Sequence, residues 1–60
     1  MSKFRNIARG TIFETDEVEG QYVKLSATVA VPVIDYRVHA EKQYIPLLSK
    51  AVQVIGVLND

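Results

Sequence analysis

The segment after residue 33 carries alternating polar side chains that could take part in acid–base chemistry. Asp35, Arg37, His39 and Glu41 are separated by single residues, so on a β-strand they would share one face. A guanidinium, an imidazole and two carboxylates can move protons or bind a metal. However, neighbours on one strand face lie about 6.6 Å apart, and one imidazole with scattered carboxylates is a weak ligand set. We therefore expect a solvated polar face, and predict neither enzymatic activity nor a cofactor.

The composition excludes several function classes. The sequence contains no glycine-rich nucleotide motif, no nucleophile elbow and no cysteine. Seven basic and seven acidic residues give a formal net charge of zero, which disfavours binding to nucleic acid or to an anionic membrane. No stretch approaches the ~20 apolar residues of a membrane span, and the basic N-terminus lacks the apolar run of a signal peptide. We expect a cytoplasmic protein, or one inside an infected host cell or a virus particle.

The size of the chain favours self-association. Its 60 residues form one domain, 1–60, and a domain this small buries only about 60% of the surface that its unfolded chain exposes. Small domains compensate with disulfides, metals or oligomerisation. The chain has no cysteine and one histidine, yet 48% of its residues are hydrophobic. We therefore predict that it binds itself, as a homodimer or higher oligomer, and binds another protein.

The N-terminal half has the pattern of a hairpin. Residues 4–14 are predicted to form a first strand, with Gly10 marking a bulge or a close backbone approach. Residues 15–20, TDEVEG, are acidic and end in glycine, which is typical of an exposed turn. A second strand begins at Gln21, so residues 4–31 should form an antiparallel hairpin.

The strand pattern changes phase in its middle. Between residues 23 and 33 the apolar positions are odd, whereas between residues 34 and 40 they are even. A shift of one residue moves every later side chain to the other face of a sheet. Pro32 lies at the shift and interrupts ladder hydrogen bonds, and the segment lacks the Asn-Gly or Asp-Gly of a tight hairpin. We predict a corner in one long strand, with Val29 and Val31 buried before it and Ile34 or Tyr36 buried after it.

The C-terminal segment is compatible with two structures. Its apolar residues fall on one broad side at helical spacing, and Pro46 suits a first helical turn. The competing prediction is a short helix over 46–51 followed by a strand, because residues 52–57 are rich in valine and isoleucine. With the helix favoured, the predicted fold is α+β: a small curled antiparallel sheet, made of a hairpin plus a bent third strand, with a C-terminal helix.

Three groups of residues are candidate binding sites. The strand over 34–40 has no hairpin mate after it and is a candidate edge, on which an antiparallel dimer centred on Tyr36 would pair opposite charges. The apolar helix face should contact the sheet or a partner. Basic residues with an aromatic near the N-terminus form the alternative site, for single-stranded nucleic acid. The groups are Asp35, Tyr36, Arg37 and Val38 on the edge; Leu48, Val52 and Ile55 on the helix; and Lys3, Phe4, Arg5 and Arg9 for nucleic acid.

These patterns predict a small non-catalytic protein-binding module that self-associates. Two settings fit: an accessory structural subunit of a larger assembly such as a virus particle, or a small protein inhibitor. The alternative is a single-stranded nucleic-acid-binding protein that uses the basic first strand. The acidic loop next to that strand in the predicted hairpin opposes a phosphate backbone.

Overall fold

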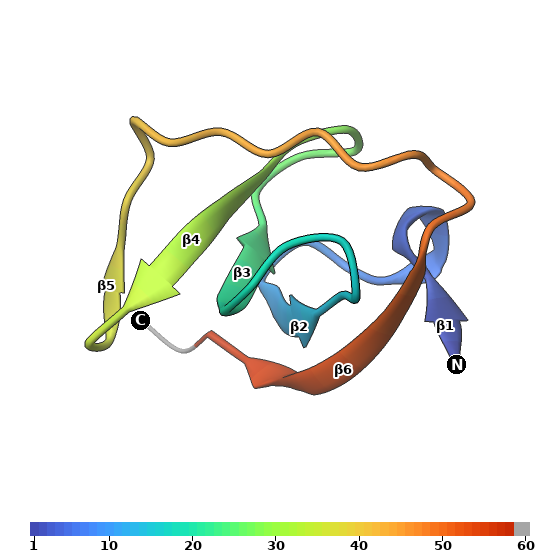
Figure 1. Cartoon of the computed structure of the whole chain (residues 1–60), viewed down its shortest axis with the longest axis horizontal. Helices are drawn as coiled ribbons and strands as arrows, with labels where there is room; N and C mark the ends of the chain where they lie inside the picture. Colours follow the sequence, from blue (N-terminus) through green and yellow to red (C-terminus); the bar gives the residue numbers. More distant parts are fainter. Residues whose placement is uncertain (59–60) are drawn as a thin grey trace.

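The computed structural model describes residues 1–58 and is all-β in that range. One antiparallel sheet has the strand order β1-β6-β2-β3-β4-β5, and the helical content is a single 3-10 turn, η1 (Figure 1). The predicted α+β class is therefore wrong. The elements are β1 (Ser2–Lys3), η1 (Phe4–Asn6), β2 (Thr11–Glu14), β3 (Gln21–Lys24), β4 (Ala30–Ile34), β5 (Arg37–Val38) and β6 (Ala51–Val57).

The predicted first strand is correct only in its second half. Strands β2 and β3 form an antiparallel hairpin around the acidic loop 15–20, but the predicted second strand over 21–31 is wrong beyond Lys24: the chain turns at residues 25–29, and β4 returns antiparallel to β3. Residues 4–6 instead form η1, because Phe4 turns inward and its N–H donates to the Lys50 carbonyl at 2.8 Å. Gly10 has a φ of +90°, and it donates to the Lys24 carbonyl and accepts from Leu58 N–H. Its left-handed backbone ends the turn and starts β2.

The phase change in the alternation marks a hairpin, so the predicted corner at Pro32 is wrong. Strands β4 and β5 pair Val33 with Val38 around the two-residue turn 35–36. Paired residues point to the same face of a sheet, so odd-numbered residues of β4 share a face with even-numbered residues of β5, which produces the phase change. Ile34 and Tyr36 are exposed, contrary to prediction. Pro32 is accommodated inside β4 because its backbone faces β5: its carbonyl accepts a hydrogen bond from His39 N–H, and its nitrogen points to the same side. The missing N–H of proline therefore removes no hydrogen bond between β4 and β3.

The C-terminal segment is a strand, and neither predicted helix forms. Residues 51–57 form β6, which pairs with β2 over Thr11–Glu14 with a register shift between Ile12 and Phe13. On its other side β6 pairs with β1, but only at Ala51 and Val52. The valine- and isoleucine-rich composition thus prevails over the helical spacing because two strands are available as hydrogen-bonding partners.

The core is built on a chain of aromatic rings. Phe4 and Phe13 are fully buried with their centroids 5.5 Å apart, Phe13 lies 6.4 Å from Tyr22, and Tyr22 lies 5.0 Å from Tyr44. Ile7, Ala30 and Val52 complete this cluster. The chain of rings connects η1, β2 and β3 to the segment that precedes β6.

A buried lysine fastens η1 to the sheet. Lys24 Nζ donates to the carbonyl oxygens of Phe4 at 2.8 Å and Ile7 at 2.9 Å, and lies 4.6 Å from the centroid of the Phe4 ring. The ammonium is a donor to the Ile7 carbonyl, which follows η1, and adds to the 3.4 Å hydrogen bond that the Phe4 carbonyl accepts from Ile7 N–H.

Candidate protein-binding surface

The polar row of residues 35–41 does not form a site. Asp35 belongs to a turn, Arg37 to β5, and His39 and Glu41 to the following segment, so the four share no strand face. A backbone hydrogen bond at Glu41, followed by His39, whose Nδ1 lies 3.5 Å from Glu41 Oε2, holds the pKa of the Glu41 carboxyl below its usual value. In residues 1–58 no three histidine or carboxylate side chains come close enough to hold a metal.

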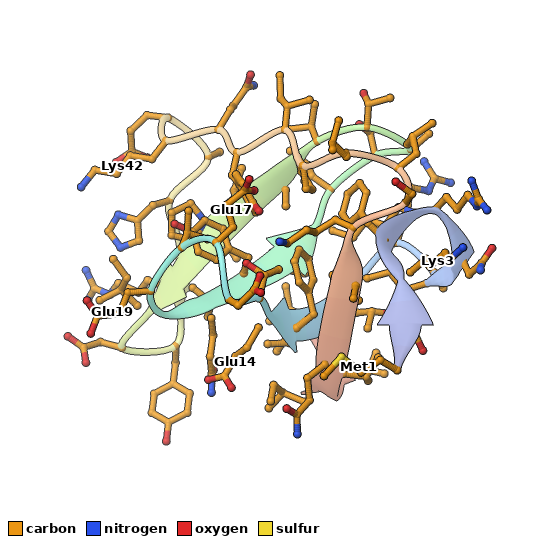
Figure 2. The ribbon with its side chains drawn as sticks, turned by 45° about the vertical axis from the view of Figure 1, so that its right-hand side comes forward. Met1, Lys3, Glu14, Glu17, Glu19 and Lys42 are labelled. Atoms are coloured by element: carbon orange, nitrogen blue, oxygen red, sulfur yellow. The ribbon has the colours of Figure 1, made fainter. Side chains whose placement is uncertain are left out.

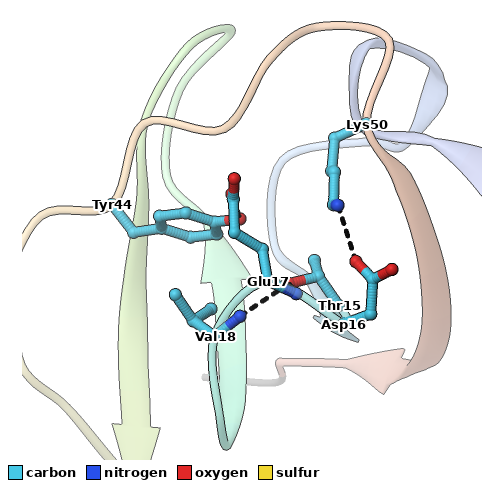
Figure 3. A network of polar contacts seen from close by, with 6 residues as sticks. All are labelled: Thr15, Asp16, Glu17, Val18, Tyr44 and Lys50. Carbon is cyan, nitrogen blue, oxygen red and sulfur yellow. Dashed lines mark hydrogen bonds and ion pairs between the residues drawn. The ribbon is translucent and has the colours of Figure 1, made fainter.

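The acidic loop 15–20 is tied to the segment before β6 by side-chain contacts. Thr15 Oγ1 accepts hydrogen bonds from the N–H groups of Glu17 and Val18, which shapes the loop. Tyr44 O–H donates to Glu17 Oε1, and Lys50 Nζ lies 2.6 Å from Asp16 Oδ1 (Figure 3). Asp16 and Glu17 are therefore engaged within the molecule, although Glu17, like Glu19 and the preceding Glu14 of β2, remains exposed (Figure 2).

These contacts shift the ionisation of the three groups. The hydrogen bond and charge of Lys50 lower the pKa of Asp16, and the same pair raises the pKa of Lys50. Partial burial, followed by the hydrogen bond to Glu17, raises the pKa of the Tyr44 hydroxyl. All three shifts favour the ionisation states present at neutral pH.

The predicted edge residues separate into a turn and a short strand. Asp35 and Tyr36 have φ angles of 52° and 64°, so both are left-handed, as a two-residue hairpin turn requires. An antiparallel strand pair therefore cannot be centred on Tyr36, and only Arg37 and Val38 lie on the edge strand β5. The Tyr36 side chain is 98% exposed at the tip of this hairpin.

An open apolar groove lies beside the hairpin tip. Its volume is about 550 Å³, and its lining joins Tyr36 to side chains of the central strands and of the end of β6. The apolar residues of this lining are Ile12, Val33, Val57 and Leu58, with Asp35 and Gln21 at polar positions. Sequence reasoning missed the groove because its residues come from four separate segments of the chain.

The residues predicted to form a helix face do not act together. Val52 is buried in the core, whereas Leu48 and Ile55 are each about half exposed and lie in different elements. Val52 is thus unavailable to a partner. Instead of the one apolar helix face that was predicted, the structure has exposed apolar side chains in two places, on the segment before β6 and on β6 itself.

The aromatic residue of the predicted nucleic-acid site is buried. Lys3, Arg5 and Arg9 are exposed, and Figure 2 shows Lys3 at the outer side of β1. Phe4 is fully buried beneath Lys24, and Phe13 in β2 is also fully buried in the core. Neither ring can therefore stack on a base.

Comparison with known proteins finds no matching family model, no similar curated protein and no similar solved structure. Nothing in the described part of the chain forms a helix with the length and hydropathy of a membrane span.

Proposed function

We propose that this protein is a small non-catalytic protein-binding module that self-associates. It would act as an accessory structural subunit of a larger assembly, such as a virus particle, or as a small inhibitor of another protein. It carries out this role without a cofactor and within the cytoplasm, an infected host cell or the assembled particle.

The observation that carries the proposal is the conformation of Tyr36. A left-handed backbone costs a residue with a side chain about 1–2 kcal/mol, and glycine or asparagine is the usual solution in such a turn. Tyr36 has this backbone, with φ of 64°, and its 98% exposed ring gains almost no burial in return. Strained residues of this kind concentrate at binding sites, and tyrosine is enriched in protein interfaces. The adjoining apolar groove extends the contact surface that the ring offers.

Nucleic-acid binding is supported less well. With Phe4 and Phe13 buried, the alternative depends on Lys3, Arg5 and Arg9 alone. Three cations on a chain of zero net charge give weak phosphate affinity. We expect no retention of single-stranded DNA or RNA in filter binding at about 50 mM salt; micromolar binding that weakens steeply with salt would favour this alternative.

Self-association is tested by sedimentation equilibrium and native mass spectrometry across a dilution series. Between about 1 μM and 1 mM chain, we expect a shift from monomer to dimer or higher oligomer, as a dissociation constant in this range implies. A monomer throughout the range would refute self-association.

A further inference from the structure

Strand β6 is uncovered along most of its outer side. It lies between β2 and β1 in the sheet, but β1 pairs only with Ala51 and Val52, and Figure 1 shows β6 curving on past β1. Among residues 1–58, no strand pairs with the outer side of residues 54–57. A sheet edge in this state presents hydrogen-bonding groups that another strand can match.

The backbone direction at Val57 confirms that polar groups face outward. Val57 is the register partner of Thr11, and the next residue, Leu58, donates to the Gly10 carbonyl at 2.8 Å. Hydrogen-bonded and non-bonded pairs alternate along an antiparallel ladder, so Val57 itself directs its N–H and C=O away from β2. Thr11 N–H correspondingly bonds to the Ala8 carbonyl.

This edge lacks the protection that the other two edges have. Strands β1 and β5 are two residues long and carry Lys3 and Arg37, and short charged edges resist pairing. Residues 51–58, AVQVIGVL, contain no charge and no proline, and the composition strongly favours strands. Val54, Ile55 and Val57 are between 45% and 65% exposed there.

We propose that the outer edge of β6, residues 54–57, pairs antiparallel with the same edge of a second copy of this chain. The proposal rests on the self-association proposed above and assigns it a surface. A two-fold axis on this edge would extend the sheet across both copies and cover the exposed side chains of Val54, Ile55 and Val57.

The second copy is the occupant that the charges favour. Like charges opposite each other destabilise a strand pair, and the uncharged segment 51–58 meets none when it faces itself. The formal net charge of zero also means that two copies approach without net repulsion. In such a dimer the half-exposed apolar side chains of one β6 would lie beside those of the other, which would reduce the exposure of both.

The decisive experiment compares two lysine substitutions in sedimentation equilibrium. Val57→Lys places a charge on the proposed edge, and Leu47→Lys makes the same change at a residue that is 74% exposed outside the sheet. We expect Val57→Lys to raise the dimer dissociation constant about tenfold or more, and Leu47→Lys to change it less than about twofold. A two-dimensional NMR spectrum of each variant establishes that it is folded.

Each other outcome contradicts the proposal in a distinguishable way. A wild-type dimer that Val57→Lys leaves intact, or that both lysines weaken equally, would overturn the β6 interface while leaving self-association standing. A wild-type chain that stays monomeric would overturn both proposals.

Two further measurements test the backbone contact itself. Val57→Pro deletes the outward N–H and spares the β2 ladder, so it should dissociate the dimer without unfolding the chain. Because the chain has no cysteine, single cysteines at positions 54–57 can be oxidised one at a time. At least one should form a disulfide dimer, since pairing brings symmetry-related Cα atoms within about 4.4–6.8 Å. A Leu47→Cys control should not; equal yields at all positions would refute the interface.

Discussion

The two loops that end neighbouring hairpins differ in what they do for the fold. The acidic loop 15–20 is six residues long and polar, and Tyr44 and Lys50 hold it against the rest of the molecule. The turn 35–36 is as short as a hairpin allows, left-handed at both positions, and ends in the most exposed aromatic ring of the chain. The acidic loop stabilises the folded state through its contacts, whereas the turn 35–36 destabilises it through its left-handed backbone.

This contrast indicates where a partner is to be sought. The acidic loop concentrates charge in the sequence, but two of its three carboxylates, Asp16 and Glu17, are already bonded within the molecule. Tyr36 and the groove beside it have no such internal role. Substitutions on the tied side should therefore lower stability, and substitutions at the turn should leave it unchanged or raise it.

The largest effect is expected at Lys24, which holds η1, and not the acidic loop, against the sheet. Lys24→Met keeps the length of the side chain but removes the donor shared by the Phe4 and Ile7 carbonyls. The Ile7 carbonyl then loses its side-chain donor and the Phe4 carbonyl retains only the 3.4 Å hydrogen bond from Ile7 N–H, which should lower the free energy of unfolding by about 1–3 kcal/mol. Urea denaturation measures it, with Lys42→Met as an exposed control. A loss below about 0.5 kcal/mol would mean that water replaces the ammonium.

A smaller loss is expected at the contact between loop 15–20 and Tyr44. Tyr44→Phe retains the ring that packs 5.0 Å from Tyr22 and removes only the hydroxyl that donates to Glu17. The free energy of unfolding should fall by about 0.5–1.5 kcal/mol in urea denaturation. Glu17→Gln should lose less, because an amide oxygen still accepts the hydrogen bond. No loss in Tyr44→Phe would show that the loop is not tied through this residue.

The turn should respond in the opposite direction. Tyr36→Gly relieves the left-handed strain at φ of 64° and removes a ring that buries almost nothing, so stability should rise by about 0.5–1 kcal/mol. Thermal unfolding followed by circular dichroism measures the gain, and Tyr36→Phe, which keeps the strain, should leave stability unchanged. A destabilised Tyr36→Gly would show that the tyrosine supports the fold and would weaken its assignment to binding.

The smallest effect is the pH dependence of the Asp16–Lys50 pair. The pKa of Asp16 is lowered on folding, so its stabilisation is present above the usual value of 3.8 and is lost as the pH falls through the folded pKa. The raised pKa values of Lys50 and Tyr44 act oppositely: their stabilisation is present below about pH 10 and is lost as the pH rises further. The difference in unfolding free energy between wild type and Asp16→Asn should therefore be constant near neutral pH and shrink at both extremes. A difference that does not change with pH would show that the pair is broken in solution.

Local patterns in the sequence identified the parts of the fold that depend on neighbours in the chain. The acidic composition and Gly20 located the loop 15–20 between two strands, whereas the alternation over 23–33 continued through the turn at residues 25–29 and so concealed the boundary between β3 and β4. The phase change after Val33 also marked a real event, the turn to β5. It was misinterpreted because Tyr36 occupies the position after Asp35 at which this turn prefers glycine, and the resulting strain is visible only in the backbone angles.

Contacts between distant residues decided the remainder. Residues 51–57 fit a helix by spacing and a strand by composition, and the choice depends on β2, about forty residues earlier in the chain. The burial of Lys24 depends likewise on carbonyls at Phe4 and Ile7, which an alternating pattern cannot foresee. Sequence by itself determined the acidic loop 15–20 and the strand segments β2 and β3 that flank it, because composition and strand propensity are local. The tertiary structure alone decided which strands pair and which edge stays open, because strand pairing joins residues far apart in the chain.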